Sequence, residues 1–288
     1  MIRTSVALLA TVAATFALTA CSEAPAGEPV VRMQLDGSSG EVLSLPSPSP
    51  TPSQAAAPSA CRDVTFENVA LTHCTADPAK NRIAMANAPA GGQPFGSMNA
   101  FAAAADAATI AFAINGGMYG DDLKPVGYYV ENGERLSEID RGDGPAGESA
   151  NFYMHPNGVF FGTGGTWRVL ARDAFIAGVG DRPQFGTQSG PMLVVDGKLH
   201  PDIQDNGPSR AVRNGVGVDA KGLAHFVISR GDISFGQLAR YFRDEVKAAN
   251  ALYLDGQVSS LWDPATARLD KGRVGPIIVV SKREGAAQ

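Results

Sequence analysis

The chain has 288 residues, with 24 basic and 29 acidic side chains and a net charge of −5. With 44% apolar residues and 33 Gly, its composition excludes a collagen, a coiled coil and a wholly disordered chain. The acidic excess offers no broad basic surface, so nucleic acid is not an expected partner.

The first 20 residues predict a secretion signal. A basic start at Arg3 is followed by an apolar stretch, residues 6–18, that is shorter than the roughly 20 residues a membrane-spanning helix needs. Leu18-Thr19-Ala20-Cys21 resembles the lipobox of bacterial lipoproteins, which implies lipidation at Cys21 and a membrane anchor. Ser22 then indicates sorting to the outer membrane, facing the periplasm. The alternative is an ordinary signal cut near Ala20, with Cys21 incidental.

Residues 21–60 predict a disordered tether after the lipidated cysteine. Residues 22–60 contain seven Pro and no aromatic residue, so they cannot bury enough apolar surface to offset the entropy of ordering. At the end of the tether, Cys61 and Cys74 are separated by 12 residues in an exported chain, which favours a disulfide worth about 3 kcal/mol. Two unpaired buried thiols are the alternative.

From residue 61 onward, short apolar runs separated by turn residues predict one sheet-rich α+β domain with a few packed helices, residues 61–283, followed by a tail at 284–288. Ser97 is expected to cap a short helix reaching about residue 107, and Ser234 a clearer one with Phe235 and Phe242 on its apolar face. Residues 219–222 predict a hairpin turn. Strands are expected at residues 64–69, 83–86, 109–114, 127–130, 158–161, 192–195, 216–218, 223–229 and 251–254.

Several standard sites have no support in the sequence. The four histidines are far apart and no Cys pair has zinc spacing, so we expect neither a metal nor a cofactor. Residues 142–149 resemble a phosphate loop, but Glu148 stands where Lys is required. Ser189 lacks the flanking pattern of a hydrolase nucleophile.

Polar residues instead adjoin several of the predicted strands, with Gly beside them. Asn115, Arg230, Asp232 and Asp255 follow strands, and Arg213 precedes one. Side chains at strand ends have rigid support, and a neighbouring Gly lets a ligand approach the backbone. Asn-Gly, Arg-Gly and Asp-Gly are also ordinary turn sequences, but several of them directly beside predicted strands favour one shared site.

These same residues carry a family resemblance. Asn115-Gly116-Gly117-Met118-Tyr119, Ser189-Gly190-Pro191-Met192, Arg213 to Gly217 and Leu252-Tyr253-Leu254-Asp255-Gly256 have the order and approximate spacing of the phosphodiester glycosidase domain, typified by the lysosomal uncovering enzyme. The chain resembles most its exported bacterial branch. The resemblance implies an α+β fold and hydrolysis of a sugar-1-phosphate diester.

The chain departs from the family at two places. The usual Asp-Gly-Arg before the helix appears here as Ser229-Arg230-Gly231-Asp232. The usual Asp-Gly-Gly-Gly-Ser is here Asp255-Gly256-Gln257-Val258-Ser259-Ser260, and we expect the larger side chains at 257 and 258 to narrow or reshape the pocket. The substrate of the animal enzyme therefore does not carry over.

Chemistry assigns candidate roles to these residues. The leaving group of a sugar-1-phosphate diester is weakly basic, so stabilising phosphate charge matters more than a strong general acid. Arg213 is the first candidate for the phosphate and Arg230 the second, because a guanidinium meets two oxygens at once. Asp255 is the predicted catalytic carboxylate and Asp232 a second one. The other predicted substrate-binding residues are Asn115, Gly116, Gly117, Gly256 and Ser259.

Two other functions stay open. One is a glycosidase that acts on a phosphate-free envelope linkage, which would not need Arg213 as a phosphate ligand. The other is a non-catalytic lipoprotein that binds an envelope glycan. The expected partners are accordingly a carbohydrate or glycosyl phosphodiester, and a membrane reached only through the lipid.

Overall fold

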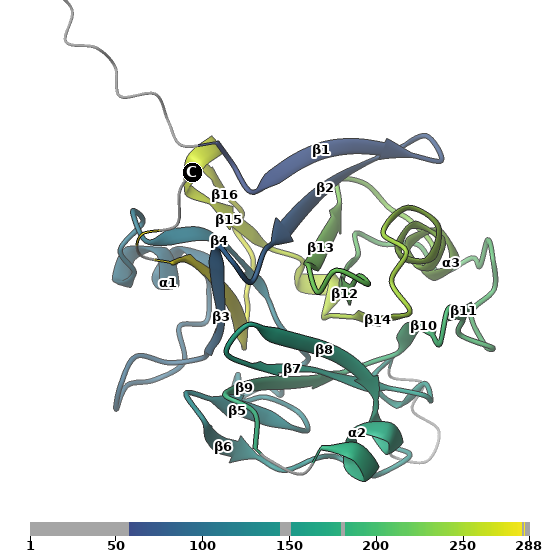
Figure 1. The fold of residues 1–288 in the computed structure, drawn as a ribbon, viewed down its shortest axis with the longest axis horizontal. Helices are drawn as coiled ribbons and strands as arrows, with labels where there is room; N and C mark the ends of the chain where they lie inside the picture. The colour runs from purple at the N-terminus through teal and green to yellow at the C-terminus, as the bar shows by residue number, and fades with distance from the viewer. Residues whose placement is uncertain (1–57, 145–150, 180–181, 284, 286–288) are drawn as a thin grey trace, which may run out of the picture. The chain divides into compact units, whose positions relative to one another are not determined.

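The fold is taken from a computed structural model, which describes residues 58–144, 151–179, 182–283 and 285 (Figure 1). The predicted signal peptide, Cys21, the tether as far as residue 57 and nearly all of the predicted tail lie outside the described residues. Within the described part, no helix is both long and apolar enough to cross a membrane.

The largest sheet has seven strands in the order β1-β2-β13-β12-β14-β10-β11, and neighbouring strands run antiparallel. Its outer hairpin, β1 and β2, turns at Glu67 and Asn68, which both have positive φ, as a two-residue hairpin turn requires. The seven strands are β1 Cys61–Phe66, β2 Val69–Ala76, β10 Met192–Val195, β11 Lys198–Leu199, β12 Asn214–Val218, β13 Ala224–Ser229 and β14 Asn250–Tyr253.

Two five-stranded antiparallel sheets complete the fold, in the orders β16-β15-β4-β17-β3 and β6-β5-β9-β7-β8. The first comprises β3 Asn81–Ala86, β4 Ile110–Asn115, β15 Leu261–Asp263, β16 Arg268–Leu269 and β17 Ile277–Lys282. The second comprises β5 Tyr129–Glu131, β6 Glu134–Ser137, β7 Gly158–Thr163, β8 Thr166–Ala171 and β9 Phe185–Ser189.

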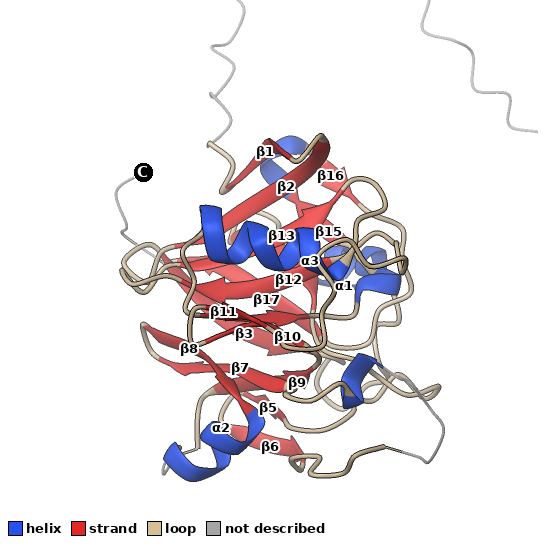
Figure 2. Cartoon of the chain, turned by 90° about the vertical axis from the view of Figure 1, so that its right-hand side faces the viewer, coloured by secondary structure: helices blue, strands red, loops and turns tan. Residues whose placement is uncertain are grey.

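Helices are few and short. In the view of Figure 2, α3 lies across one face of the seven-stranded sheet. The helical segments are α1 Met98–Ala104, α2 Arg172–Gly178, α3 Phe235–Arg240 with its π-helical continuation Tyr241–Glu245, and the 3-10 turns Asn151–Tyr153, Gly256–Val258 and Pro264–Thr266.

One core joins the three sheets. Phe226 of the large sheet contacts Phe112 of β4 at 5.4 Å and Phe160 of β7 at 5.7 Å between ring centroids. Its neighbour Val227 points to the opposite face, where it packs in the cluster that includes Leu238 of α3. Because both faces of the strand are covered, every residue of β13 is buried, including His225 and Ser229.

The structure confirms the type of most elements that the sequence predicted. The domain is sheet-rich with few helices, the residue 219–222 hairpin joins β12 to β13, and Ser97 and Ser234 cap α1 and α3. Several predictions were wrong in extent. The strand expected at residues 127–130 starts at Tyr129. The strand expected at residues 64–69 is interrupted by the turn at Glu67 and Asn68, and α1 ends at Ala104, before the expected residue 107.

Candidate active site

The ends of β4 and β14 meet at Asn115. Its side-chain nitrogen donates to the backbone oxygen of Asp255 at 2.7 Å, and its side-chain oxygen accepts from Asn214 at 2.8 Å and from the backbone nitrogen of Ser260 at 3.0 Å. Asn115 is 1% exposed, so its amide holds the segment around Asp255 in position. The structure thus brings two predicted site residues together, and the role of Asn115 toward a sugar hydroxyl stays a prediction.

Asp255 follows β14 and is half-buried. Its backbone N–H donates to Gly116 at 3.2 Å, which ties the two strand ends together a second time. Burial raises the pKa of the Tyr119 phenol and of the Tyr253 phenol, and the negative charge of Asp255 contributes to both increases. The predicted catalytic carboxylate therefore lies near two phenols that the sequence reasoning did not assign.

The glycines of this region are needed for packing. A Cβ at Gly117 would collide with the backbone oxygen of Gln188 and the hydroxyl of Thr187, and one at Gly256 would collide with the Tyr253 hydroxyl. The Gly117 backbone N–H also donates to the Thr187 hydroxyl at 3.2 Å. The sequence predicted that a ligand approaches the backbone at Gly117 and Gly256. Protein atoms occupy that space instead.

Arg213 is 2% exposed and its guanidinium is held by neighbouring protein groups. Nε donates to the Ile233 carbonyl at 3.0 Å, Nη2 to the carbonyl and hydroxyl oxygens of Ser209 at 3.1 and 2.9 Å, and Nη1 to the Tyr253 hydroxyl at 3.3 Å. The Phe235 ring covers the guanidinium at 3.6 Å. Burial lowers the pKa of Arg213. Four of five N–H groups are thus used within the protein.

Arg230 and Asp232 follow β13 and are both exposed. Arg230 donates through Nη2 to Asp63 at 2.7 Å and through Nε to the Thr72 hydroxyl at 3.2 Å. Asp232 is close enough to Arg213 for its charge to oppose the burial-induced fall in the pKa of that guanidinium. Of the two predicted phosphate ligands, only Arg230 is open to solvent.

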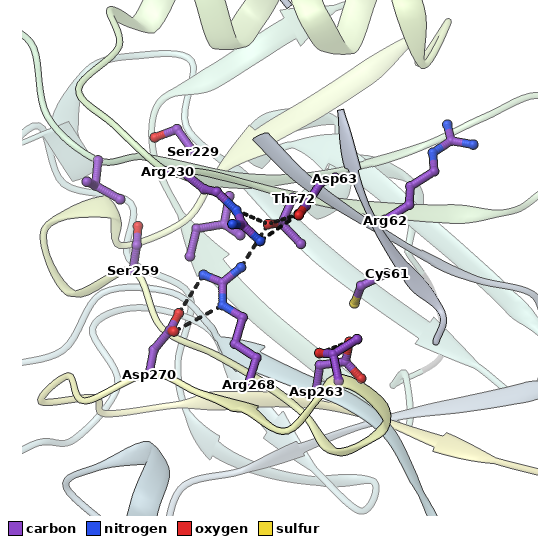
Figure 3. A pocket seen from close by; sticks show the side chains of 13 residues that line it. Cys61, Arg62, Asp63, Thr72, Ser229, Arg230, Ser259, Asp263, Arg268 and Asp270 are labelled. Carbon is purple, nitrogen blue, oxygen red and sulfur yellow. Dashed lines mark hydrogen bonds and ion pairs between the residues drawn. The ribbon is translucent and has the colours of Figure 1, made fainter. Parts of the chain in front are cut away.

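A cavity of about 700 Å³, here called the arginine pocket, adjoins these strand ends (Figure 3). Ser229, on its wall, accepts the backbone N–H of Arg213 at 2.9 Å, and Ser259, also on its wall, donates to the Gly256 carbonyl at 2.7 Å. The charged residues that line the pocket are Arg62, Arg230, Arg268, Asp63, Asp263 and Asp270.

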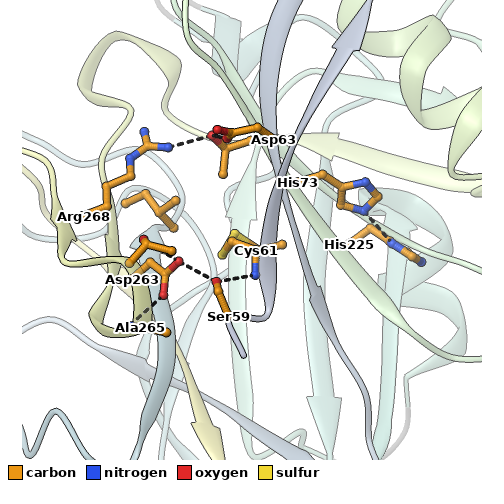
Figure 4. Close-up of a disulfide and its surroundings, with 12 residues drawn as sticks. Ser59, Cys61, Asp63, His73, His225, Asp263, Ala265 and Arg268 are labelled. Carbon is orange, nitrogen blue, oxygen red and sulfur yellow. Dashed lines mark hydrogen bonds between the residues drawn. A yellow bond between two sulfur atoms is a disulfide. The ribbon is translucent and has the colours of Figure 1, made fainter. Parts of the chain in front are cut away.

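The predicted disulfide between Cys61 and Cys74 is confirmed and joins β1 to β2 beside the pocket (Figure 4). The Cys61 backbone N–H donates to the Ser59 hydroxyl at 2.9 Å, and that hydroxyl donates to Asp263 at 2.6 Å. Asp263 is 1% exposed and ends β15. These contacts fix the first hairpin against the sheet that carries β4.

Arg268, Asp270 and Thr72 were missed by the sequence reasoning. Arg268 and Asp270 are alternate residues, so a strand would place both on one face, which is the signal that could have paired them. Nothing in the local pattern shows that they face Arg230. Among the described residues, no three His, Cys, Asp or Glu side chains come together as metal ligands would.

Residues 108–280 match the family model of the phosphodiester glycosidases, a segment that includes Asn115, Arg213 and Asp255. The chain belongs to the phosphodiester glycosidase family. It is 33% identical over 189 residues to the Escherichia coli K12 protein YigE, a match covering 65% of this chain and 72% of that protein.

A solved family structure shares this fold. It is the zebrafish N-acetylglucosamine-1-phosphodiester alpha-N-acetylglucosaminidase catalytic domain, auto-inhibited by its pro-peptide, with a TM-score of 0.52 and 14% identity over 77% of this chain and 82% of that chain. In the present chain, Arg62, Asp63 and Thr72 precede the segment that matches the family. One wall of the arginine pocket thus comes from a part of the chain outside the family match.

Proposed function

We propose that this chain hydrolyses a sugar-1-phosphate diester, or a related glycan linkage, in the bacterial cell envelope. The main support is that Asn115 and Asp255 are held together at the strand ends, beside an arginine-lined pocket and within the segment that matches the family. The proposal makes the protein a hydrolase whose reacting bond joins an anomeric carbon to a phosphate oxygen.

In this proposal Asp255 acts at the anomeric carbon. It either activates water or stabilises the oxocarbenium-like centre, and the departing phosphomonoester needs little protonation because it is weakly basic. Asp232 is the proposed second carboxylate. Both carboxylates are at the ends of strands, as a preorganised site requires.

The two arginines receive different tasks. Arg230 is the one proposed to contact the phosphate directly, because it is exposed, lines the pocket and, among the described residues, uses two of its five N–H groups. Arg213 is proposed as a positioning residue that holds the Tyr253 hydroxyl near Asp255. This reverses the order of preference that the sequence suggested.

The proposed location follows from the start of the sequence. A signal at residues 1–20, lipid on Cys21 and a tether to residue 60 would anchor the domain, residues 61–283, to the outer membrane on its periplasmic side. Envelope glycans would then be within its reach.

The deciding experiment compares sugar-1-phosphate methyl diesters with the corresponding methyl glycosides, measuring release of free sugar by the purified protein. Asp255→Asn should lower diester hydrolysis by about 10²- to 10⁴-fold. Asp196→Asn is the matched control, because Asp196 also follows a strand and precedes Gly but lies in an exposed turn.

Three results would redirect the proposal. Hydrolysis of glycosides and not of diesters would favour the phosphate-free glycosidase. Binding of glycans without any hydrolysis would favour a glycan-binding lipoprotein. Diester hydrolysis by Asp255→Asn at the wild-type rate would remove Asp255 from the mechanism.

A further inference from the structure

Two guanidiniums of the arginine pocket meet on one hydroxyl. The Thr72 hydroxyl accepts from Arg230 Nε at 3.2 Å and from Arg268 Nη1 at 2.8 Å, and it donates to Asp63 at 3.0 Å. Thr72 is 3% exposed, so this hydroxyl is a fixed point on the wall. Two like charges are therefore held side by side (Figure 3).

Each of the two guanidiniums keeps N–H groups for a ligand. Arg230 donates two hydrogen bonds, to Thr72 and Asp63, and Arg268 donates three, to Thr72 and to both oxygens of Asp270. Of five N–H groups each, three on Arg230 and two on Arg268 have no partner among the described residues. Forked donors of this kind match the oxygens of a phosphate or carboxylate.

The charges that line the pocket balance, with three arginines and three aspartates. The carboxylate of Asp263 is engaged by other groups: it accepts hydrogen bonds from the Ser59 and Thr266 hydroxyls and from the Ala265 backbone N–H. Of the other two carboxylates, Asp63 pairs with Arg230 and Asp270 with Arg268, each at 2.7 Å, whereas the Arg62 side chain points away from them in Figure 3. An anion would therefore be bound by the N–H groups that Arg230 and Arg268 keep unused, and not by an excess of positive charge.

We propose that Arg230 and Arg268 together bind the phosphate of the phosphomonoester half of the substrate, and that the alcohol of this half is a polyol or a sugar. This proposal rests on the proposed function, because that function decides which half of the diester lies in the arginine pocket. It assigns Arg268 as a specificity-determining residue.

The lining of the pocket supports a polar alcohol over a lipid chain. Four hydroxyl residues line it, Thr72, Ser229, Ser259 and Thr266, together with the charged groups. An alkyl chain in this place would remove ions from water without giving them partners, which is costly. Hydroxyl groups of a polyol can instead bond to the carboxylates and to Ser259.

The test measures equilibrium binding of glycerol 1-phosphate to the purified protein by calorimetry. Arg268→Gln should weaken binding by about tenfold, since one fork is lost. Arg135→Gln is the matched control, because Arg135 is an exposed arginine of β6 paired with Glu138, and it should bind within twofold of wild type. Octyl phosphate should bind more weakly than glycerol 1-phosphate.

Arg268→Lys guards against misfolding of the glutamine variant. Lys keeps the charge and loses the fork, so we expect a threefold or larger loss of affinity at an unchanged melting temperature. Unchanged affinity in both Arg268 variants, no binding by the wild type at millimolar concentration, or tighter binding of octyl phosphate would overturn the proposal.

The binding assay also separates this proposal from the proposed function. If diesters are not hydrolysed but binding depends on Arg268 as expected, the catalytic proposal fails and the anion site stands. If diesters are hydrolysed but the Arg268 variants bind glycerol 1-phosphate as tightly as the wild type, the anion site fails and the catalytic proposal stands.

Discussion

Replacing His73 with Gln should change how the stability of the protein depends on pH. His73 is 4% exposed on β2, and its ring nitrogens lie 2.8 Å from the Tyr241 hydroxyl and 2.8 Å from Nδ1 of His225. Burial, with the nearby His225 and Arg62, lowers the pKa of His73 to about 3. The folded protein therefore keeps this ring neutral at pH values where an unfolded chain protonates it.

The sign and size follow from linkage. Because the folded pKa lies below the 6.5 of an ordinary histidine, the unfolded chain alone takes up a proton between pH 6.5 and about 3. The free energy of unfolding therefore falls as the pH falls through this range. Between pH 7.5 and 5.5 the loss from this single group is about 1.4 kcal/mol. Below about pH 6, the slope approaches 1.4 kcal/mol per pH unit.

Urea unfolding of wild type and His73→Gln at pH 7.5, 6.5 and 5.5 measures this loss. The wild type should lose about 1.4 kcal/mol more than the variant between the two extremes, whatever the variant's stability at pH 7.5. Tyr241→Phe is the matched control, because it removes the hydroxyl that contacts His73 at 2.8 Å but keeps the titrating ring. It should retain the wild-type pH dependence. Parallel curves for wild type and His73→Gln would refute the reasoning.

Three further outcomes are expected. Gly256→Ala should lower the free energy of unfolding by about 1 to 3 kcal/mol in urea unfolding, because its Cβ would collide with the Tyr253 hydroxyl, whereas Gly178→Ala, with open space beside it, should stay within about 0.5 kcal/mol. Arg213→Lys should cost about 2 kcal/mol in the same assay, because Lys cannot reproduce the four hydrogen bonds, and an unchanged midpoint would contradict the buried geometry. Cys21→Ser should release the protein from the membrane fraction, and retention after a high-salt wash would exclude lipid on Cys21 as the anchor.

Local signals in the sequence predicted local structure well. The Ser234 hydroxyl accepts the Gln237 backbone N–H at 3.1 Å, so the cap that the sequence indicated is present. The hairpin at residues 219–222 forms because the Asp219 side chain accepts from the backbone of Lys221 and Leu223. Such features depend on residues a few positions apart, which a sequence displays directly.

The elements that were missed have weak local signals or distant partners. The start of α2 has Ala171 at its cap and no side-chain hydrogen bond, so no capping residue announces it. β17 pairs with both β3 and β4, which lie more than 150 residues earlier in the chain, and no local pattern records such a pairing. The arrangement into three sheets could therefore not be derived from periodicity.

The candidate site divides in the same way. Asn115 and Asp255 were predicted because polar residues at strand ends were expected to form one site. The structure joins these two residues through a hydrogen bond of 2.7 Å. The sequence reasoning could not foresee that Phe235 of α3 would cover Arg213, because that contact depends on how the helix packs. It missed Arg268 because the Thr72 hydroxyl that it shares with Arg230 is 196 residues away in sequence.

The residues proposed for substrate choice and those proposed for the reaction lie in different parts of the chain. The proposed catalytic Asp255 lies within residues 108–280, the segment that matches the family, whereas Thr72 and Asp63, which position Arg230, lie on the β1–β2 hairpin before it. The Cys61–Cys74 disulfide fixes this hairpin independently of that segment. The two proposals therefore predict that changes in the hairpin alter which phosphomonoester half is accepted, while the contacts that hold Asp255, through Asn115, stay the same. In such an arrangement, related chains can share one reaction and differ in substrate.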